Sequence, residues 1–247
     1  MFFEKRYYRK YINNKFTCFE TTQGESNLFI SYEGNYSLDK VKRKVDTFLL
    51  EIRTILKDIV NRHKQFLTSL TPTSINDPFL PEIILKMLKA SQKALVGPWA
   101  GVAGAVAFYV GEKLLKEFNF NSLFIENGGD CFLISKNEIS LGIFIPNLEK
   151  ILPIKLPPGK WGVSSSSSKK GHSLSFGRTN LATVIVKNDP ILSDCLATYF
   201  GNSTNFEDAL KKLEKMKNTY DGLLISLKDK FIFDGKIFQD IFENVKK

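Results

Sequence analysis

Histidine, cysteine and tryptophan are scarce in this chain of 247 residues, which contains two, three and two of them. Cys18, Cys131 and Cys195 stand far apart and form no C-x-x-C pair. This spacing argues against a disulfide scaffold and a structural zinc site, and it favours a reducing compartment. No charge-free apolar run is long enough to span a bilayer, and the N-terminus lacks the apolar segment of a signal peptide. We therefore expect a cytoplasmic protein without a membrane contact.

The composition allows a large core and gives the chain a basic surface. Hydrophobic residues make up 43% of the sequence, with 21 phenylalanines, and the formal net charge is +9. The lysines and arginines are scattered among 26 acidic residues, so the sequence favours an ordinary lysine-rich surface over a nucleic-acid interface. Basic and aromatic residues interleave at 6–11, which fits an amphipathic strand or stacking on single-stranded nucleic acid.

Hydrophobic periodicity predicts blocks of helices that alternate with antiparallel strands. Residues 15–32 are typical of a hairpin, and a long helix is expected from an N-cap at Ser37 to Leu67. Further helices are expected at 81–95, from Pro98 onward, at 190–201 and at 206–216, and further strands at 123–125, 131–134, 141–145, 182–186, 223–227 and 230–233. The proline-rich stretch 153–159 is interpreted as a connection and the five serines at 164–168 as a mobile loop. The predicted class is α+β, with one domain over 1–247.

The stretch from Val96 to Asp130 is the centre of this organisation. Its first part is rich in glycine and alanine, and it ends in an apolar run followed by Asn127, Gly128, Gly129 and Asp130. Small residues allow a backbone to approach something bulky, and glycine permits a positive φ. Two interpretations stay open, a ligand pocket at the Gly-Gly-Asp turn or close helix–sheet packing followed by a tight turn.

Two later stretches carry polar groups that could do chemistry. Asp194 and Thr198 lie four residues apart on a predicted helix, so they share a face and offer oxygen ligands suited to Mg²⁺. The alternative is a solvated helix face. His172 follows the serine run and could act as a general base, with Ser167, Ser168 and the Gly171 amide binding an anion. A linker histidine is the competing interpretation.

Four segments in this order resemble the ApbE-like superfamily, and most closely its shorter branch. They are V-G-P-W-A-G-V-A-G-A at 96–105, E-N-G-G-D at 126–130, G-H-S-L-S-F-G at 171–177 and D-C-L-A-T at 194–198. The resemblance covers roughly residues 1–235. It implies a T-fold-like arrangement of antiparallel sheets packed against helices, and it leaves open two pseudo-symmetric halves that meet near residues 96–130.

The resemblance also implies a ligand and roles for particular residues. ApbE flavin transferases bind FAD with Mg²⁺ and move FMN onto a threonine of a partner protein. Asp194 and Thr198 match the metal-binding positions, and a carbonyl near Ala103 is the implied third ligand. Gly128, Gly129 and Asp130 match the turn at the cleft, and His172 matches a histidine of the catalytic segment.

The sequence departs from the transferases in that segment, where Ser175 and Phe176 replace an aspartate and a proline, and Asn180 stands where the branch often has an aspartate. The first hypothesis is therefore a protein that binds FAD, FMN or another diphosphate-bearing, nucleotide-like ligand with Mg²⁺. An active FMN transferase or FAD diphosphate hydrolase is the second hypothesis, and a non-enzymatic basic scaffold that binds nucleic acid or a partner protein is the third. A homodimer is left open.

Overall fold

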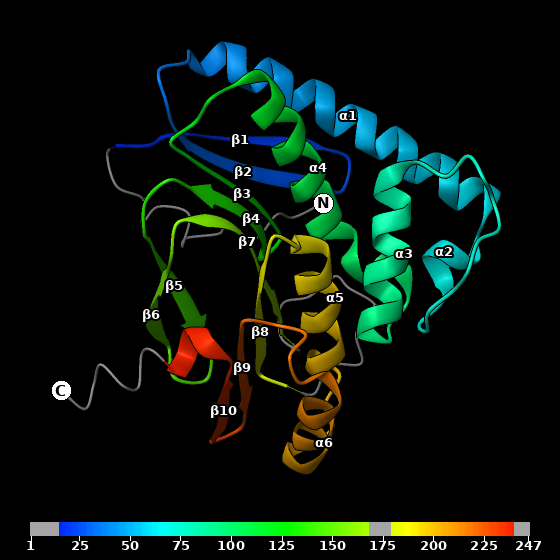
Figure 1. Cartoon of the computed structure of the whole chain (residues 1–247), viewed down its shortest axis with the longest axis vertical. Helices are drawn as coiled ribbons and strands as arrows, with labels where there is room; N and C mark the ends of the chain where they lie inside the picture. The colour runs from blue at the N-terminus through cyan, green and yellow to red at the C-terminus, as the bar shows by residue number, and fades with distance from the viewer. Residues whose placement is uncertain (1–14, 168–178, 240–247) are drawn as a thin grey trace.

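A computed structural model describes residues 15–167 and 179–239, and its centre is one antiparallel sheet of eight strands (Figure 1). Its strands are β1 (Thr17–Gln23), β2 (Ser26–Glu33), β3 (Ser122–Asn127), β4 (Asp130–Ser135), β7 (Gly159–Ser166), β8 (Leu181–Lys187), β9 (Gly222–Leu227) and β10 (Lys230–Asp234). They lie in the order β1-β2-β3-β4-β7-β8-β9-β10, and every neighbouring pair is antiparallel. β5 (Ile139–Ile145) and β6 (Lys150–Leu156) form a separate hairpin.

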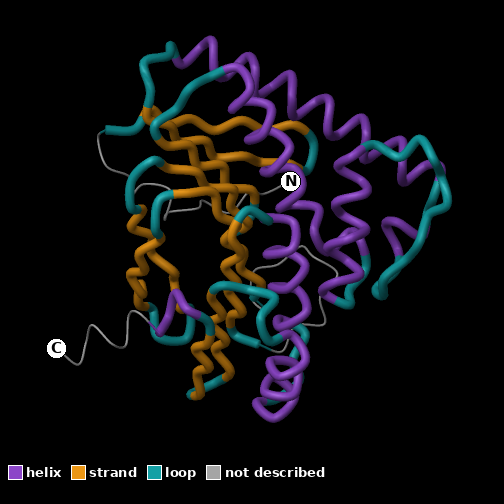
Figure 2. Tube along the Cα trace, viewed as in Figure 1, coloured by secondary structure: helices purple, strands orange, loops and turns teal. Residues whose placement is uncertain are grey.

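The helices from α1 to α6 pack on one side of this sheet, and the β5–β6 hairpin and a short helical turn at 236–239 pack on the other (Figures 1 and 2). The helical elements are α1 (Leu38–Arg62), α2 (Gln65–Thr68), α3 (Glu82–Ala94), the 3-10 helix η2 (Pro98–Gly101), α4 (Val102–Glu117), α5 (Pro190–Gly201) and α6 (Phe206–Met216). Strand side chains alternate between the two cores: Leu223 and Ile225 join the helix-side core, whereas Leu224 joins the hairpin-side core. This period of two is that of a sheet buried on both faces. The expected α+β class is confirmed.

The two halves of the sheet repeat the same succession of elements. β1 and β2 form a hairpin, a helical segment follows, and β3 and β4 form a second hairpin. β7 and β8, then α5 and α6, then β9 and β10 follow the same plan, and β4 pairs with β7 where the halves join. This succession is consistent with two pseudo-symmetric halves, which stays a prediction.

Three expectations about local structure were wrong. Residues 153–159 are not a plain connection, because β6 and the start of β7 occupy most of them. Ser164, Ser165 and Ser166 are not a loop, because they pair with Val184, Thr183 and Ala182 of β8. The long helix ends at Arg62 rather than at Leu67, and the Ser37 side chain makes no capping hydrogen bond.

The start of α5 is fixed by its own sequence. Pro190 occupies the first helical position, which tolerates the missing N–H, and the Asp189 carboxylate accepts a hydrogen bond from the Leu192 amide at 3.0 Å. We expect Asp189→Ala to lower the free energy of unfolding by about 1 kcal/mol in urea titrations. Asp229→Ala, at an exposed position between β9 and β10, is the control and should change it by less than about 0.5 kcal/mol. Equal losses in both variants would contradict the capping role.

None of the described helices alone is long and apolar enough to cross a bilayer. α3 and the η2–α4 segment have the length and composition of a span only when taken together, and they meet at a bend of 110°.

Candidate functional site

A two-residue turn between β3 and β4 places Asp130 at the centre of the sheet. Gly128 and Gly129 have φ values of +75° and +107°, as the turns of twisted hairpins require. The Gly129 amide donates a hydrogen bond to Glu126 Oε1 at 2.7 Å, which holds the turn closed. Asp130 therefore begins β4, opposite Ser164 of β7.

Helix α5 lies across β7 and carries Asp194 to the same place. Gly162 of β7 permits this close approach, because a Cβ at that position would lie 2.4 Å from the Pro190 Cα. Gly104 of α4 lies equally close to α5, since a Cβ at this position would lie 2.5 Å from the Pro190 carbonyl oxygen. The small residues of the 96–107 stretch thus pack α4 against α5, and the close-packing interpretation holds for Gly104.

Asp194 caps helix α4 from a distance of 90 residues in the sequence. The N-cap residue Gly101 has no side chain that could accept a hydrogen bond, whereas Asp194 Oδ2 accepts one from the Gly104 amide at 2.8 Å. A carboxylate at a helix N-terminus is stabilised by the free amides and by the helix dipole. The alternative interpretation of a solvated helix face is wrong, because Asp194 and Thr198 are only 7% and 8% exposed.

The carbonyl of Ala103 faces the same region. Asn127, the last residue of β3, donates a hydrogen bond from Nδ2 to Ala103 O at 3.3 Å. Asn127 is buried and is paired with Asp130 across the turn. Elements that are far apart in the sequence, α4, α5 and the β3–β4 turn, therefore place a carbonyl, two carboxylates and an amide close together.

Burial gives the two carboxyl groups a strong preference for holding protons. It raises the pKa of Asp194 to about 7, although hydrogen bonds from the Gly104 and Ala103 amides and from Asp130 act in the opposite direction. Burial and then the negative charge of Asp194 raise the pKa of Asp130 well above its usual range. Two buried acids in contact share protons at neutral pH, and a cation would neutralise them.

The donors around this pair suit Mg²⁺ rather than a softer metal. Carboxylate, carbonyl and hydroxyl oxygens are the ligands that Mg²⁺ prefers. The Ser164 hydroxyl is fully buried beside Asp130, and its interaction with that carboxyl lowers the pKa of Asp130 against the larger effect of burial. Residues 15–167 and 179–239 hold no cluster of three or more His, Cys, Asp or Glu that could bind a metal. Mg²⁺ at two carboxylates would complete its shell with neutral oxygens and a ligand phosphate.

The structure brings together some of the predicted site residues. Asp130, Asp194 and the Ala103 carbonyl converge, Gly128 and Gly129 form the adjacent turn, and Thr198 lies one helical turn beyond Asp194. Ser167 follows the end of β7. Ser168, Gly171 and His172 lie outside the described residues.

Three residues of the site were not predicted from the sequence. They are Asn127, Ser164 and Gly104. The signal for Asn127 was present, because a polar residue ends an apolar strand directly before a Gly-Gly turn. The Ser164 signal was hidden in a run of five serines that was interpreted as a loop.

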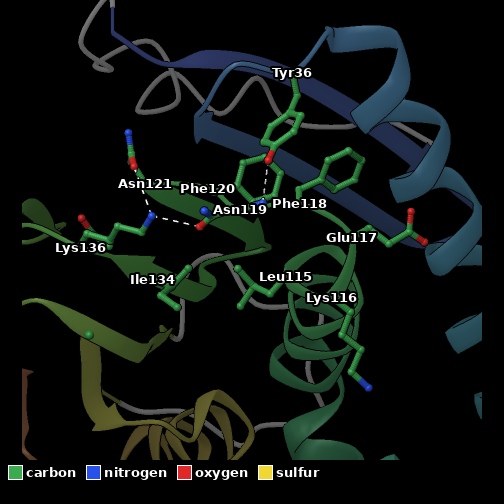
Figure 3. Close-up of a pocket in the computed structure, with 12 residues that line it drawn as sticks. Tyr36, Leu115, Lys116, Glu117, Phe118, Asn119, Phe120, Asn121, Ile134 and Lys136 are labelled. Atoms are coloured by element: carbon green, nitrogen blue, oxygen red, sulfur yellow. Dashed lines mark hydrogen bonds between the residues drawn. The ribbon is translucent and has the colours of Figure 1, made fainter.

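A separate hollow of about 610 Å³ lies at the other end of β4 (Figure 3). Its lining includes Tyr36, Leu115 and Ile134, and Lys136 Nζ donates hydrogen bonds to the side-chain oxygens of Asn119 and Asn121. Asp130 begins β4 and Ser135 ends it, so the hollow and the acid pair are roughly 17 Å apart along the strand. None of the predicted site residues lines this hollow.

The fold of this chain is similar to that of solved structures. The flavin transferase ApbE from Vibrio cholerae superposes with a TM-score of 0.58 at 12% identity, covering 91% of this chain and 98% of that one. The ApbE protein from Thermotoga maritima gives a TM-score of 0.57 at 15% identity, covering 92% and 99%. At such low identity the likeness concerns the fold, which is that of the ApbE proteins.

The sequence comparisons establish the family. The chain belongs to the family described as "AbpE bacteria", whose family model matches residues 9–221. A UPF0280 protein of Methanocaldococcus jannaschii is 35% identical over 209 residues, which cover 79% of this chain and 82% of the relative. A UPF0280 protein of Archaeoglobus fulgidus is 35% identical over 175 residues, covering 70% and 71%. The expected relation to a short ApbE-like branch is confirmed.

Proposed function

We propose that this protein binds a flavin nucleotide, FAD or FMN, or another diphosphate-bearing ligand, together with Mg²⁺ at the Asp130–Asp194 pair. The observation that carries the proposal is the meeting of these two buried carboxyl groups with the Ala103 carbonyl at the start of α4. Solved structures of the same fold are named flavin transferases, which supports a flavin as the ligand.

Each residue of the site has a distinct task in this proposal. Asp194 and Asp130 supply negative charge, and the Ala103 carbonyl and the Thr198 hydroxyl supply neutral oxygens. When bound, Mg²⁺ would offset the charge of a diphosphate. The Gly128–Gly129 turn has no side chains, so a ligand can approach its backbone closely.

Calorimetry with FAD and FMN, with and without Mg²⁺, tests this function. We expect FAD to bind at least about tenfold more tightly with Mg²⁺, because the cation screens the diphosphate from the two carboxylates. Asp130→Asn should remove most of this Mg²⁺ dependence, whereas Asp229→Asn, an exposed acid on the β9–β10 turn, should leave it intact. Absence of binding by both flavins at millimolar concentration would refute a flavin as the ligand.

The transferase and hydrolase hypotheses can be tested on the same purified protein. Release of AMP from FAD, or flavin fluorescence on an acceptor peptide in a gel, would show that the bound nucleotide is cleaved. His172→Ala tests the role that the sequence resemblance gives this residue. Activity that is unchanged in this variant would show that another group serves as the base.

A further inference from the structure

Asn127 makes a contact that neither turn formation nor strand pairing requires. It ends β3 and is 9% exposed, and Nδ2 donates to the carbonyl of Ala103, which lies 24 residues earlier in the chain. Ala103 is in the first turn of α4, so its carbonyl is also positioned for the usual helical hydrogen bond to the residue four positions later. The Asn127 amide adds a second contact to this oxygen, and its distance of 3.3 Å is at the long end for a hydrogen bond.

The peptide units around Ala103 are held from two directions. The Ala103 and Gly104 amides donate hydrogen bonds to Asp194, while the Ala103 carbonyl accepts from Asn127. Asp194 therefore holds the N–H groups of this short backbone segment, and Asn127 holds one of its carbonyl groups. Because Asn127 pairs with Asp130 across the Gly-Gly turn, the position of Asn127 is tied to that of Asp130 on the next strand.

We infer that Asn127 is a positioning residue that aligns the Ala103 carbonyl with the carboxyl groups of Asp130 and Asp194 and so sets the affinity of the site for Mg²⁺. This inference rests on the proposed function. Mg²⁺ requires near-ideal octahedral geometry at about 2.0–2.1 Å, whereas Ca²⁺ accepts longer and more variable distances. A side chain that aims a ligand oxygen should therefore affect Mg²⁺ binding more than Ca²⁺ binding.

The experiment measures Mg²⁺ and Ca²⁺ affinities of the full chain by calorimetry in wild type and Asn127→Leu. Leucine keeps the volume but removes the donor. We expect Mg²⁺ affinity to fall about 10- to 100-fold, the range seen when residues that orient metal ligands are removed. Ca²⁺ affinity should fall much less, so the ratio of the two affinities should change. Asn127→Ser, which is shorter and less disruptive, should show the same direction if the leucine variant folds poorly.

Asn121→Leu is the matched control, because Asn121 directly precedes the same strand at its far end. It should leave both affinities unchanged. An Asn127 variant that keeps wild-type Mg²⁺ affinity would overturn this inference alone, as would a parallel loss of Mg²⁺ and Ca²⁺ binding, which indicates a purely structural role. A wild-type protein that binds neither Mg²⁺ nor flavin would overturn the proposed function and this inference with it.

Discussion

Asp194→Asn is expected to weaken Mg²⁺ binding strongly and, without the cation, to stabilise the protein at pH 8. Asparagine retains an oxygen for the Gly104 amide and gains an N–H that can donate to Asp130, so the α4 cap survives. It removes one of two buried negative charges that repel each other. Mg²⁺ affinity should fall at least about 100-fold, because a charged ligand is lost.

The pH dependence of stability follows from the direction of the pKa shifts. Both carboxyl groups have a raised pKa when folded, so the folded chain holds more protons than the unfolded chain above about pH 4. Stability must therefore decrease as pH rises toward and through the Asp194 pKa of about 7. At about 1.4 kcal/mol per pKa unit, Asp194 alone accounts for a decrease of the order of 2–4 kcal/mol.

Thermal and urea unfolding at pH 5 and pH 8 measure this effect. Asp194→Asn should show a smaller decrease between the two pH values than wild type, and it should exceed wild type at pH 8. Saturating Mg²⁺ should raise the unfolding temperature of wild type at pH 8 but not that of the variant. A variant that is less stable than wild type by the same amount at both pH values would show that the carboxyl pair is not a source of repulsion.

Gly162→Ala is expected to cause a large loss of stability from a single added methyl group. Its Cβ would lie 2.4 Å from Pro190 Cα, 2.8 Å from Pro190 N and 3.0 Å from Asp189 O. All three are backbone atoms, so no side chain can rotate away, and α5 must move off β7. We expect the free energy of unfolding to fall by about 3 kcal/mol. Mg²⁺ affinity should also fall, because Asp194 moves with the helix.

Gly34→Ala is the control for this substitution. A Cβ at Gly34 would lie 3.2–3.3 Å from ring atoms of Tyr36 and Phe120, which can shift by a few tenths of an ångström. Its effect on unfolding in urea should stay below about 1 kcal/mol. Equal effects of the two substitutions would mean that the contact between α5 and β7 is not rigid.

The sequence predicted the elements whose own hydrophobic periodicity and propensity favour the observed conformation. Helix α6 has the predicted bounds Phe206–Met216, and β9, Gly222–Leu227, begins one residue before the predicted strand at 223–227. β6 was not predicted, because proline disfavours a strand and Pro153 lies within it. In the structure Pro153 pairs with Gly142 in a two-stranded hairpin, where both strands are edge strands and tolerate proline. The serines of β7 have little strand propensity, and β4 and β8 on either side impose the extended conformation.

The same distinction applies to the site. Asp130, Asp194 and Ala103 were identified by resemblance, because they lie in recurring segments. The role of Asn127 depends on which way an amide points after three elements have packed, and no local pattern encodes that direction. The burial of Asp194 was likewise invisible, since a carboxylate four residues from a threonine is typical of a wet surface.

The bond between Gly104 and Asp194 has a consequence for biosynthesis. Helix α4 leaves the ribosome long before α5, and until the later segment has been made and docked, the first turn of α4 lacks its acceptor. A contact between residues 90 positions apart is expected to form late in folding, because the long segment between them must first be ordered. A truncated chain that ends before α5 would lack the cap and one of the two acids, so added Mg²⁺ would protect only full-length molecules against proteolysis.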